Sequence, residues 1–198
     1  MQLLVPHADF ITFNLTAEPG ASLLESRHRA TLRGMLGDAS SARPRTRLRP
    51  MLFAKLAHGI VDATHVVLEE LMRADFDGVV LAAECRGEGT VPESEALRTL
   101  AALARRVDGQ LAVVAVGGAA DAWGIRARLD CGADLVQVHR AFQRGGAAWL
   151  RRVREQCAAR SASEARHPET ARGSMTGDTP KELSPILLSA GAGQPSGE

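Results

Sequence analysis

One stretch of the chain, residues 111–142, constrains the fold more than any other. It begins with the short apolar run LAVVAV, which is bounded by glycines and is typical of a buried parallel strand. The pair Gly117 and Gly118 comes directly after this run, and Asp121 can cap the helix that comes next. Residues 134–138 then form another strand. The stretch therefore predicts two turns at the carboxyl ends of two neighbouring parallel strands, where α/β folds hold phosphates.

The rest of the chain repeats this alternation of strand and helix. Ser22 and Gly37 bracket the first predicted helix, as its start and its stop. Strands separated by helices of about 12 residues imply a parallel sheet with right-handed crossovers. A closed barrel of eight such units typically needs about 250 residues, so the pattern leaves an open α/β sheet or a partial barrel of about five βα units. The predicted strands cover residues 8–14, 51–57 and 77–83, and the predicted helices cover residues 22–36, 63–74, 93–107 and 147–159.

The composition divides the chain into two parts. Residues 1–160 carry the alternating pattern and form one predicted domain, whereas residues 161–198 are rich in Ser, Ala, Gly, Pro and Glu without periodicity. Such a composition predicts a disordered tail. Residues 183–188 form a small apolar island in it, a weak docking segment at best.

Charge and cysteine content exclude several classes of function. The 24 Lys and Arg nearly balance the 23 Asp and Glu, so no nucleic-acid partner is indicated. The arginine clusters at residues 43–49 and 151–154 are interpreted as a solvated loop and a solvated helix face. The three cysteines are scattered without a CxxC motif, which predicts no metal site and a reducing, cytoplasmic location. The sequence contains no run of about 18 apolar residues, so no membrane span is predicted.

Few residues stand out as candidates for a site. Gly117 and Gly118 can bring backbone N–H groups close to a phosphate or simply make a tight turn. Arg140 can add charge to the same anion or stay solvated. Lys55 lies inside an apolar strand, so it either reaches a ligand or extends its amine to solvent. Asn14 ends a strand, where it can contact a ligand or cap a turn.

The series ADFITFN, MLFAKLA, DGVVLAA, LAVVAVGGA and CGADLVQVHRAF resembles, in order and spacing, the carboxyl-terminal part of the quinone-linked dihydroorotate dehydrogenases. That family has an N-x-S-S/C-P-N loop, a K-I-A-P-D-L strand, a T-N-T strand end, a V-G-G turn and a G-A-S-L-V-Q-[IV]-Y-[ST]-G turn. The resemblance covers about residues 8–159. It implies that the predicted domain is a partial TIM-type (β/α) barrel.

The resemblance also implies a flavin site. Asn14 and Lys55 would lie against the flavin of FMN, and Gly117, Gly118, His139 and Arg140 would surround its phosphate. Gly89 matches a glycine of the family's G-L-S-G loop once a deletion is allowed. The implied activity is oxidation of dihydroorotate to orotate in pyrimidine biosynthesis, with quinone as the acceptor and a cytoplasmic or membrane-peripheral location.

Two departures from the family pattern predict a loss of catalysis, so no catalytic residue is assigned. Ala17 stands where the family has its Ser or Cys base, and Ala83 stands where it has the substrate-binding Asn. The first strands of the family's barrel have no counterpart in the series. The alternatives are a non-catalytic half-barrel whose open edge is covered by a second copy or another partner, and a different phosphate-binding α/β enzyme.

Overall fold

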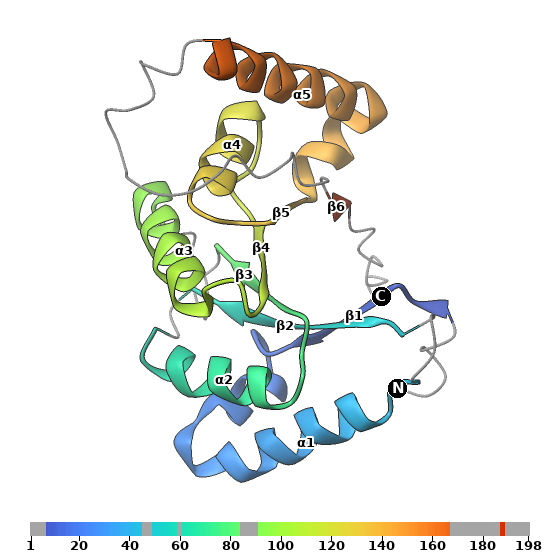
Figure 1. Cartoon of the computed structure of the whole chain (residues 1–198), viewed down its shortest axis with the longest axis vertical. Helices are drawn as coiled ribbons and strands as arrows, with labels where there is room; N and C mark the ends of the chain where they lie inside the picture. The colour runs from blue at the N-terminus through green and yellow to red at the C-terminus, as the bar shows by residue number, and fades with distance from the viewer. Residues whose placement is uncertain (1–6, 45–48, 59–60, 84–90, 167–186, 189–198) are drawn as a thin grey trace, which may run out of the picture.

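A computed structural model describes residues 7–44, 49–58, 61–83, 91–166 and 187–188. Strands and helices alternate along the chain, as the sequence predicts (Figure 1). The elements are β1 (Phe10–Asn14), two 3₁₀ turns η2 (Gly20–Leu24) and η3 (Ser26–His28), α1 (Arg29–Ser41), β2 (Met51–Ala57), α2 (Val61–Arg73), β3 (Gly78–Ala82), α3 (Glu93–Val107), β4 (Ala112–Val116), α4 (Ala122–Asp130), β5 (Leu135–Val138), α5 (Arg140–Arg166) and β6 (Leu187–Leu188).

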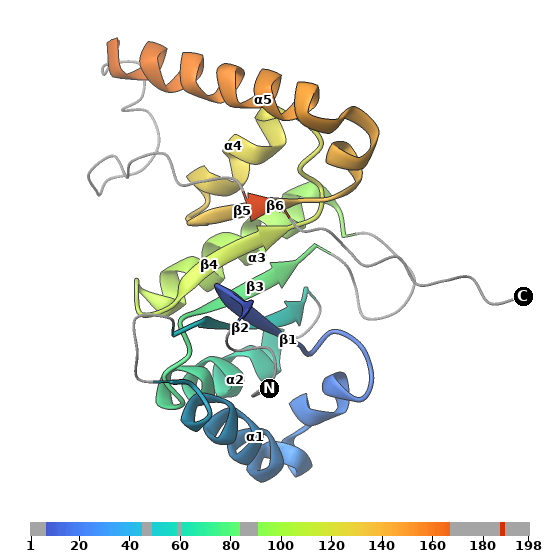
Figure 2. The ribbon, with the colours of Figure 1, turned by 90° about the vertical axis from the view of Figure 1, so that its right-hand side faces the viewer.

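The strands form one parallel sheet in the order in which they occur along the chain, β1-β2-β3-β4-β5-β6 (Figure 2). Sequential neighbours joined by helices are the arrangement of a (β/α) barrel. Among the described residues β1 pairs with β2 only, so the sheet is not closed. The prediction of a partial barrel of about five βα units is therefore confirmed, and the short β6 adds a strand to the edge of β5.

The two faces of the sheet are covered differently. Alternate strand residues such as Ala54, Val79 and Val113 pack against buried side chains of α1, α2 and α3. The opposite face carries a separate cluster of Phe53, Val80 and Val114, and every member of that cluster comes from a strand. In a closed barrel this second face points into the lumen, so we call the face that carries Phe53, Val80 and Val114 the lumen-type face.

Helices α4 and α5 form a third apolar cluster with β5. Trp149 and Val153 on α5 are buried against Ile125 of α4. The helix begins earlier than predicted, at Arg140, and Gly146 interrupts it with non-helical backbone angles. The chain thereby changes direction before the long second part of α5.

The first predicted helix is wrong at both ends. Ser22 lies in a 3₁₀ turn and donates to the Pro19 carbonyl instead of capping a helix. The helix proper begins at Arg29 and continues through Gly37 to Ser41. A mid-helix glycine costs only about 1 kcal/mol relative to alanine, and burial of Leu32 and Leu36 on the core side of α1 offsets that cost.

Charged groups organise the amino ends of the strands. Arg43 was predicted to be solvated, but its side chain is only 2% exposed and pairs with Asp77 at 2.5 Å. Asp77 also accepts a hydrogen bond from the Leu52 amide, and Asp134 accepts one from the Val113 amide.

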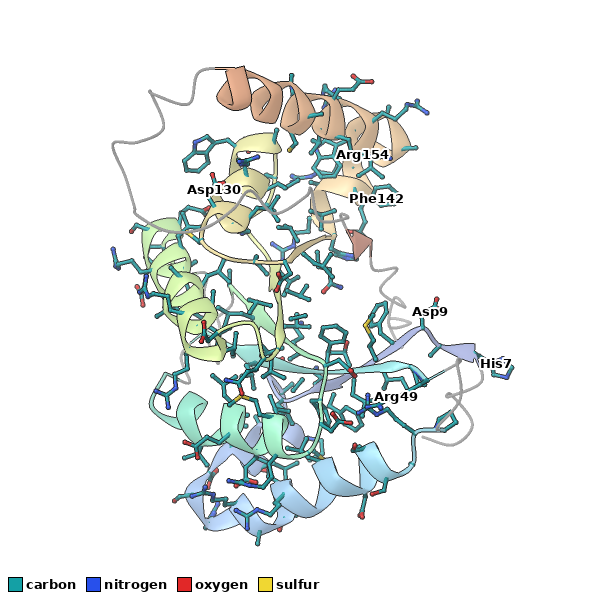
Figure 3. The ribbon with its side chains drawn as sticks, in the orientation of Figure 1. His7, Asp9, Arg49, Asp130, Phe142 and Arg154 are labelled. Atoms are coloured by element: carbon teal, nitrogen blue, oxygen red, sulfur yellow. The ribbon has the colours of Figure 1, made fainter. Side chains whose placement is uncertain are left out.

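Arg49 lies at the β1–β2 end of the molecule, away from Phe142 and Arg154 on α5 (Figure 3). The other predicted cluster behaves as expected, because the three arginines at positions 151, 152 and 154 are exposed.

Candidate functional site

The turn after β4 carries a row of three backbone amides that are candidates for binding a ligand. We call residues 117–119 the glycine turn. Within the described part of the chain, the N–H groups of Gly117, Gly118 and Ala119 make no hydrogen bond. The turn's carbonyls are in use, since Gly117 accepts from Arg128 and Gly118 accepts from the Ala120 amide. A turn whose carbonyls accept hydrogen bonds within the protein while its N–H groups stay available is suited to binding an anion.

Both glycines are required by the backbone. Gly117 has φ +95° and Gly118 has φ +68°, in the left-handed region that other residues enter at a cost of about 1–2 kcal/mol. A Cβ on Gly118 would also lie 2.2 Å from Nη2 of Arg128, and a Cβ on Gly117 would lie 3.2 Å from Cβ of Ala83. The Gly-Gly pair found in the sequence therefore has a conformational and a steric reason.

Two further contacts hold the segment between the glycine turn and α4. Asp121 caps α4 by accepting a hydrogen bond from the Gly124 amide at 2.8 Å, as predicted. Trp149 of α5 donates from Nε1 to the Ala120 carbonyl at 3.2 Å. The turn is thus held from both helices of the α4–α5 cluster.

Asn14 and Lys55 lie side by side on the sheet. They are register partners, and Lys55 is in turn the partner of Val80, so all three share the lumen-type face. The Lys55 side chain is half-buried. Oδ1 of Asn14 accepts hydrogen bonds from the amide and the hydroxyl of Thr16, which is the turn-capping role that the sequence left open.

His139 and Arg140 come directly after β5, the strand next to β4. Both are exposed, and the His139 carbonyl accepts from the Gln143 amide as α5 begins. The topology therefore brings this turn to the same end of the sheet as the glycine turn. Gly89 lies outside the described residues. The roles of all these residues toward a ligand stay predictions.

Ala17 and Ala83, the two alanines at which the sequence departs from the family pattern it resembles, differ in their surroundings. Ala17 is exposed in the loop after β1. Ala83 follows β3, donates from its amide to the Val116 carbonyl at 2.8 Å, and packs against Gly117. Neither side chain can accept a proton or donate a hydrogen bond.

Sequence reasoning missed the charged pair beside the glycine turn. Arg128 on α4 is only 2% exposed, and its guanidinium pairs with Glu93, the first residue of α3. Trp123 in the first turn of the same helix is 60% exposed. This reversal of the usual hydropathy was visible in the sequence only as an arginine three residues after Ile125, on a face that a helix would bury.

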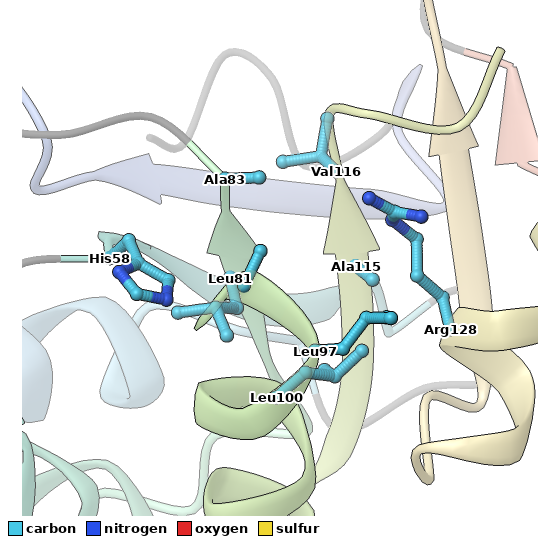
Figure 4. Close-up of a pocket in the computed structure, with 9 residues that line it drawn as sticks. His58, Leu81, Ala83, Leu97, Leu100, Ala115, Val116 and Arg128 are labelled. Carbon is cyan, nitrogen blue, oxygen red and sulfur yellow. The ribbon is translucent and has the colours of Figure 1, made fainter. Parts of the chain in front are cut away.

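Arg128 also lines a small, mostly apolar pocket between α3 and the carboxyl ends of β3 and β4 (Figure 4). His58 lies at its other side, buried, with Nε2 3.2 Å from the carbonyl oxygen of Glu95. The pocket is too narrow for a flavin. Its lining is formed by His58, Leu81, Ala83, Ala96, Leu97, Leu100, Ala115, Val116 and Arg128.

Metal binding and thiol chemistry gain no support from the described residues. They contain no group of three or more His, Cys, Asp or Glu side chains placed to hold a metal ion. Burial raises the pKa of the Cys131 thiol, which keeps it protonated and poorly nucleophilic. In the part of the chain that the structure describes, no helix has the length and apolar character needed to cross a membrane.

The comparisons with known proteins point in one direction. No protein-family model matches the chain. It is 32% identical over 192 residues to a dihydroorotate dehydrogenase (quinone) of Kineococcus radiotolerans, covering 84% of this chain and 52% of that protein. It is 29% identical over 181 residues to the enzyme of the same name from Azorhizobium caulinodans, covering 77% of this chain and 49% of that protein.

A solved structure agrees in fold. The crystal structure of dihydroorotate dehydrogenase from Eimeria tenella, in complex with ferulenol, superposes with a TM-score of 0.62 and 19% identity, covering 75% of this chain and 48% of that one. The chain thus spans about half the length of the relatives it matches.

Fold and site together define a partial (β/α) barrel whose glycine turn, at the carboxyl ends of the strands, has three amides that make no hydrogen bond to the described residues. The sequence matches show to which family within this class of proteins the chain is related. The chain is a divergent homologue of the quinone-linked dihydroorotate dehydrogenases, as the resemblance in its motifs predicts.

Proposed function

We propose that this chain binds FMN in the manner of the dihydroorotate dehydrogenases but oxidises dihydroorotate at no measurable rate. The observation that carries the proposal is the glycine turn. Three successive amides that have no acceptor among the described residues stand at the end of β4, beside the N-terminus of α4. Backbone donors and a helix N-terminus favour a phosphate at that place.

The residues of the chain divide the binding task. The amides of the glycine turn would hold the phosphate, with the exposed Arg140 supplying a positive charge from the next turn. Lys55 and Asn14, adjacent on the lumen-type face, would lie under the ring system. FMN, when bound, supplies a two-electron acceptor.

The missing groups explain the expected lack of turnover. Ala17 offers no base for the proton of dihydroorotate, and Ala83 offers no amide to hold the substrate. A positioned general base alone is typically worth about 10²–10⁴-fold in rate. With both losses, we expect FMN binding and catalysis to be separable properties of this chain.

Titration with FMN tests binding. Both tryptophans of the chain lie near the glycine turn, Trp149 through its bond to the Ala120 carbonyl and Trp123 in the first turn of α4. We expect FMN to quench tryptophan fluorescence saturably and to raise the melting temperature. The absence of both effects would refute the binding proposal.

Steady-state assays test the catalytic half of the proposal. Dihydroorotate-dependent reduction of a soluble quinone should be undetectable for the FMN-loaded protein, with a relative such as the Kineococcus enzyme as the positive control. Turnover that is readily measured would show that another residue replaces the base expected at position 17.

A binding module is the second candidate. Phe10 and Met51 are register partners on the lumen-type face and are 36% and 45% exposed. Apolar side chains at an open sheet edge are suited to a covering partner. Light scattering of the wild type and of a Phe10→Ser, Met51→Ser double variant tests this second function. A wild type that is monomeric and carries no bound protein would contradict it.

A further inference from the structure

Arg128 occupies an unusual position for a charged residue. Its side chain projects from α4 toward the carboxyl end of β4, near Val116 (Figure 4), and is 2% exposed. Burying a guanidinium is costly unless its charge is paired and its N–H groups have acceptors. The contacts of Arg128 therefore indicate what the protein obtains from this burial.

Every nitrogen of the guanidinium donates to a protein acceptor. Nε donates to the Gly117 carbonyl at 3.0 Å, and Nη1 donates to the Gly124 carbonyl at 2.6 Å. The charge is matched by Glu93, whose two carboxylate oxygens lie 2.8 Å from Nη1 and 3.1 Å from Nη2. Arg128 thus joins the glycine turn, the first turn of α4 and the start of α3.

The glycine turn is shaped around this guanidinium. A Cβ at Gly118 would lie 2.2 Å from Nη2 of Arg128 and 3.0 Å from Oε2 of Glu93. The absence of a side chain at Gly118 is what admits the ion pair against the backbone. Because the carbonyl of Gly117 is fixed by Arg128, the orientation of the following peptide, whose donor is the Gly118 amide, is fixed with it.

We propose that Arg128, held by Glu93, is a positioning residue that orients the amides of the glycine turn toward a phosphate monoester. The role that we assign to Arg128 is indirect, because four of its five N–H groups are directed to protein oxygens. The proposal rests on the proposed FMN site and adds a specificity to it: the Arg128–Glu93 pair acts on the phosphate end of the ligand and leaves the ring end unaffected.

The test compares FMN with riboflavin, which has the same ring system but no phosphate. We expect Arg128→Met to weaken FMN binding about tenfold or more, the loss expected when charge-assisted donors no longer order the turn, and to change riboflavin binding less than about twofold. Arg126→Met is the matched control, since Arg126 lies on the same helix and pairs with Asp130; it should leave both affinities unchanged. Equal weakening of FMN and riboflavin, or unchanged FMN binding, would overturn the positioning role.

Two additional arms keep the outcome interpretable. Arg128→Lys preserves a positive charge for Glu93 and is the milder variant to use if Arg128→Met does not fold. It should still lower the ratio of FMN to riboflavin affinity, because an ammonium cannot make the same set of contacts. Inorganic phosphate serves as a second probe, read as a shift in melting temperature. A wild type stabilised by phosphate but not by FMN refutes the proposed function alone, and the loss of that shift in Arg128→Met supports the positioning role. A wild type that binds neither probe refutes both.

Discussion

Glu70 provides a direct test of how this partial barrel is held together. Its carboxylate is 1% exposed on α2 and contacts three arginines: Arg33 through two bonds of 2.7 and 2.9 Å, Arg29 at 3.1 Å and Arg73 at 2.7 Å. Two of these arginines belong to α1, so the cluster joins α1 to α2 on the outside of the sheet. Removing the charge of Glu70 should weaken that junction.

The size of the effect can be worked out from the pKa of Glu70. Hydrogen bonding from Arg33, against the opposing effect of burial, lowers this pKa from 4.5 to about 2. A shift of that size corresponds to at most about 3 kcal/mol of stability. Because the side chains of Arg29, Arg33 and Arg73 are 44–56% exposed, solvent screening reduces it, and we expect about 1–2 kcal/mol for Glu70→Gln at neutral pH.

The sign with pH is fixed by the direction of the shift. A carboxylate whose pKa is lower in the folded state contributes its full stabilisation above the unfolded-state pKa, near 4.5, and loses it as the pH falls toward 2. Urea denaturation of wild type and Glu70→Gln from pH 7 to pH 3 should therefore show a difference in unfolding free energy that is constant above about pH 5 and shrinks below it. Glu69→Gln is the control, since Glu69 is the exposed neighbour on the same helix. A difference that stays constant down to pH 3, or that equals the control's at pH 7, would refute the reasoning.

Three further changes have expected outcomes. Gly118→Ala should destabilise the chain more than Gly109→Ala, because both positions have positive φ (+68° and +73°) but only Gly118 faces a clash; equal melting temperatures would contradict the close approach of Arg128. Asp121→Ala removes the cap of α4 and should cost about 1 kcal/mol in urea unfolding, whereas an unchanged midpoint would show that the cap is dispensable. Deleting residues 167–198 exposes the edge of β5 that β6 covers and should promote self-association in light scattering; a truncated chain that associates no more than the full chain would contradict this.

Local pattern was sufficient for most of the fold. The predicted strand at residues 51–57 and the predicted helix at residues 93–107 agree with β2 and α3 residue for residue. Both have a strong apolar pattern with clear punctuation at the ends, so neighbouring residues alone specify them. The predicted end of the first helix was wrong because tertiary packing decides it: Leu32 and Leu36 are buried, and this outweighs the propensity of Gly37 to stop a helix.

The buried charges could not be predicted from the sequence. Arg128 and Glu93 are 35 residues apart, and Arg33 and Glu70 are 37 apart. No local pattern records such pairs, because each is created by the way that successive βα units pack. For the same reason the sequence assigned Arg43 to a solvated loop, although Asp77 neutralises it in a buried position. The glycine turn was predictable because its requirement is local: a strand, two glycines and a helix cap.

This difference in locality explains how binding and catalysis can diverge in one chain. In the proposed site the glycine turn would bind phosphate through main-chain amides, so most substitutions around it would leave its donors intact provided that Gly117 and Gly118 keep their positive φ. Catalysis as the resemblance implies it depends on side-chain atoms at single positions, so one change at the positions of Ala17 or Ala83 would remove a group outright. A backbone site therefore tolerates sequence divergence that a side-chain site does not, and the phosphate end of the site is expected to persist longest. The double substitution Ala17→Ser, Ala83→Asn in the FMN-loaded protein should accordingly raise turnover of dihydroorotate without altering the affinity for FMN. A change in that affinity would show that the two parts of the site are coupled.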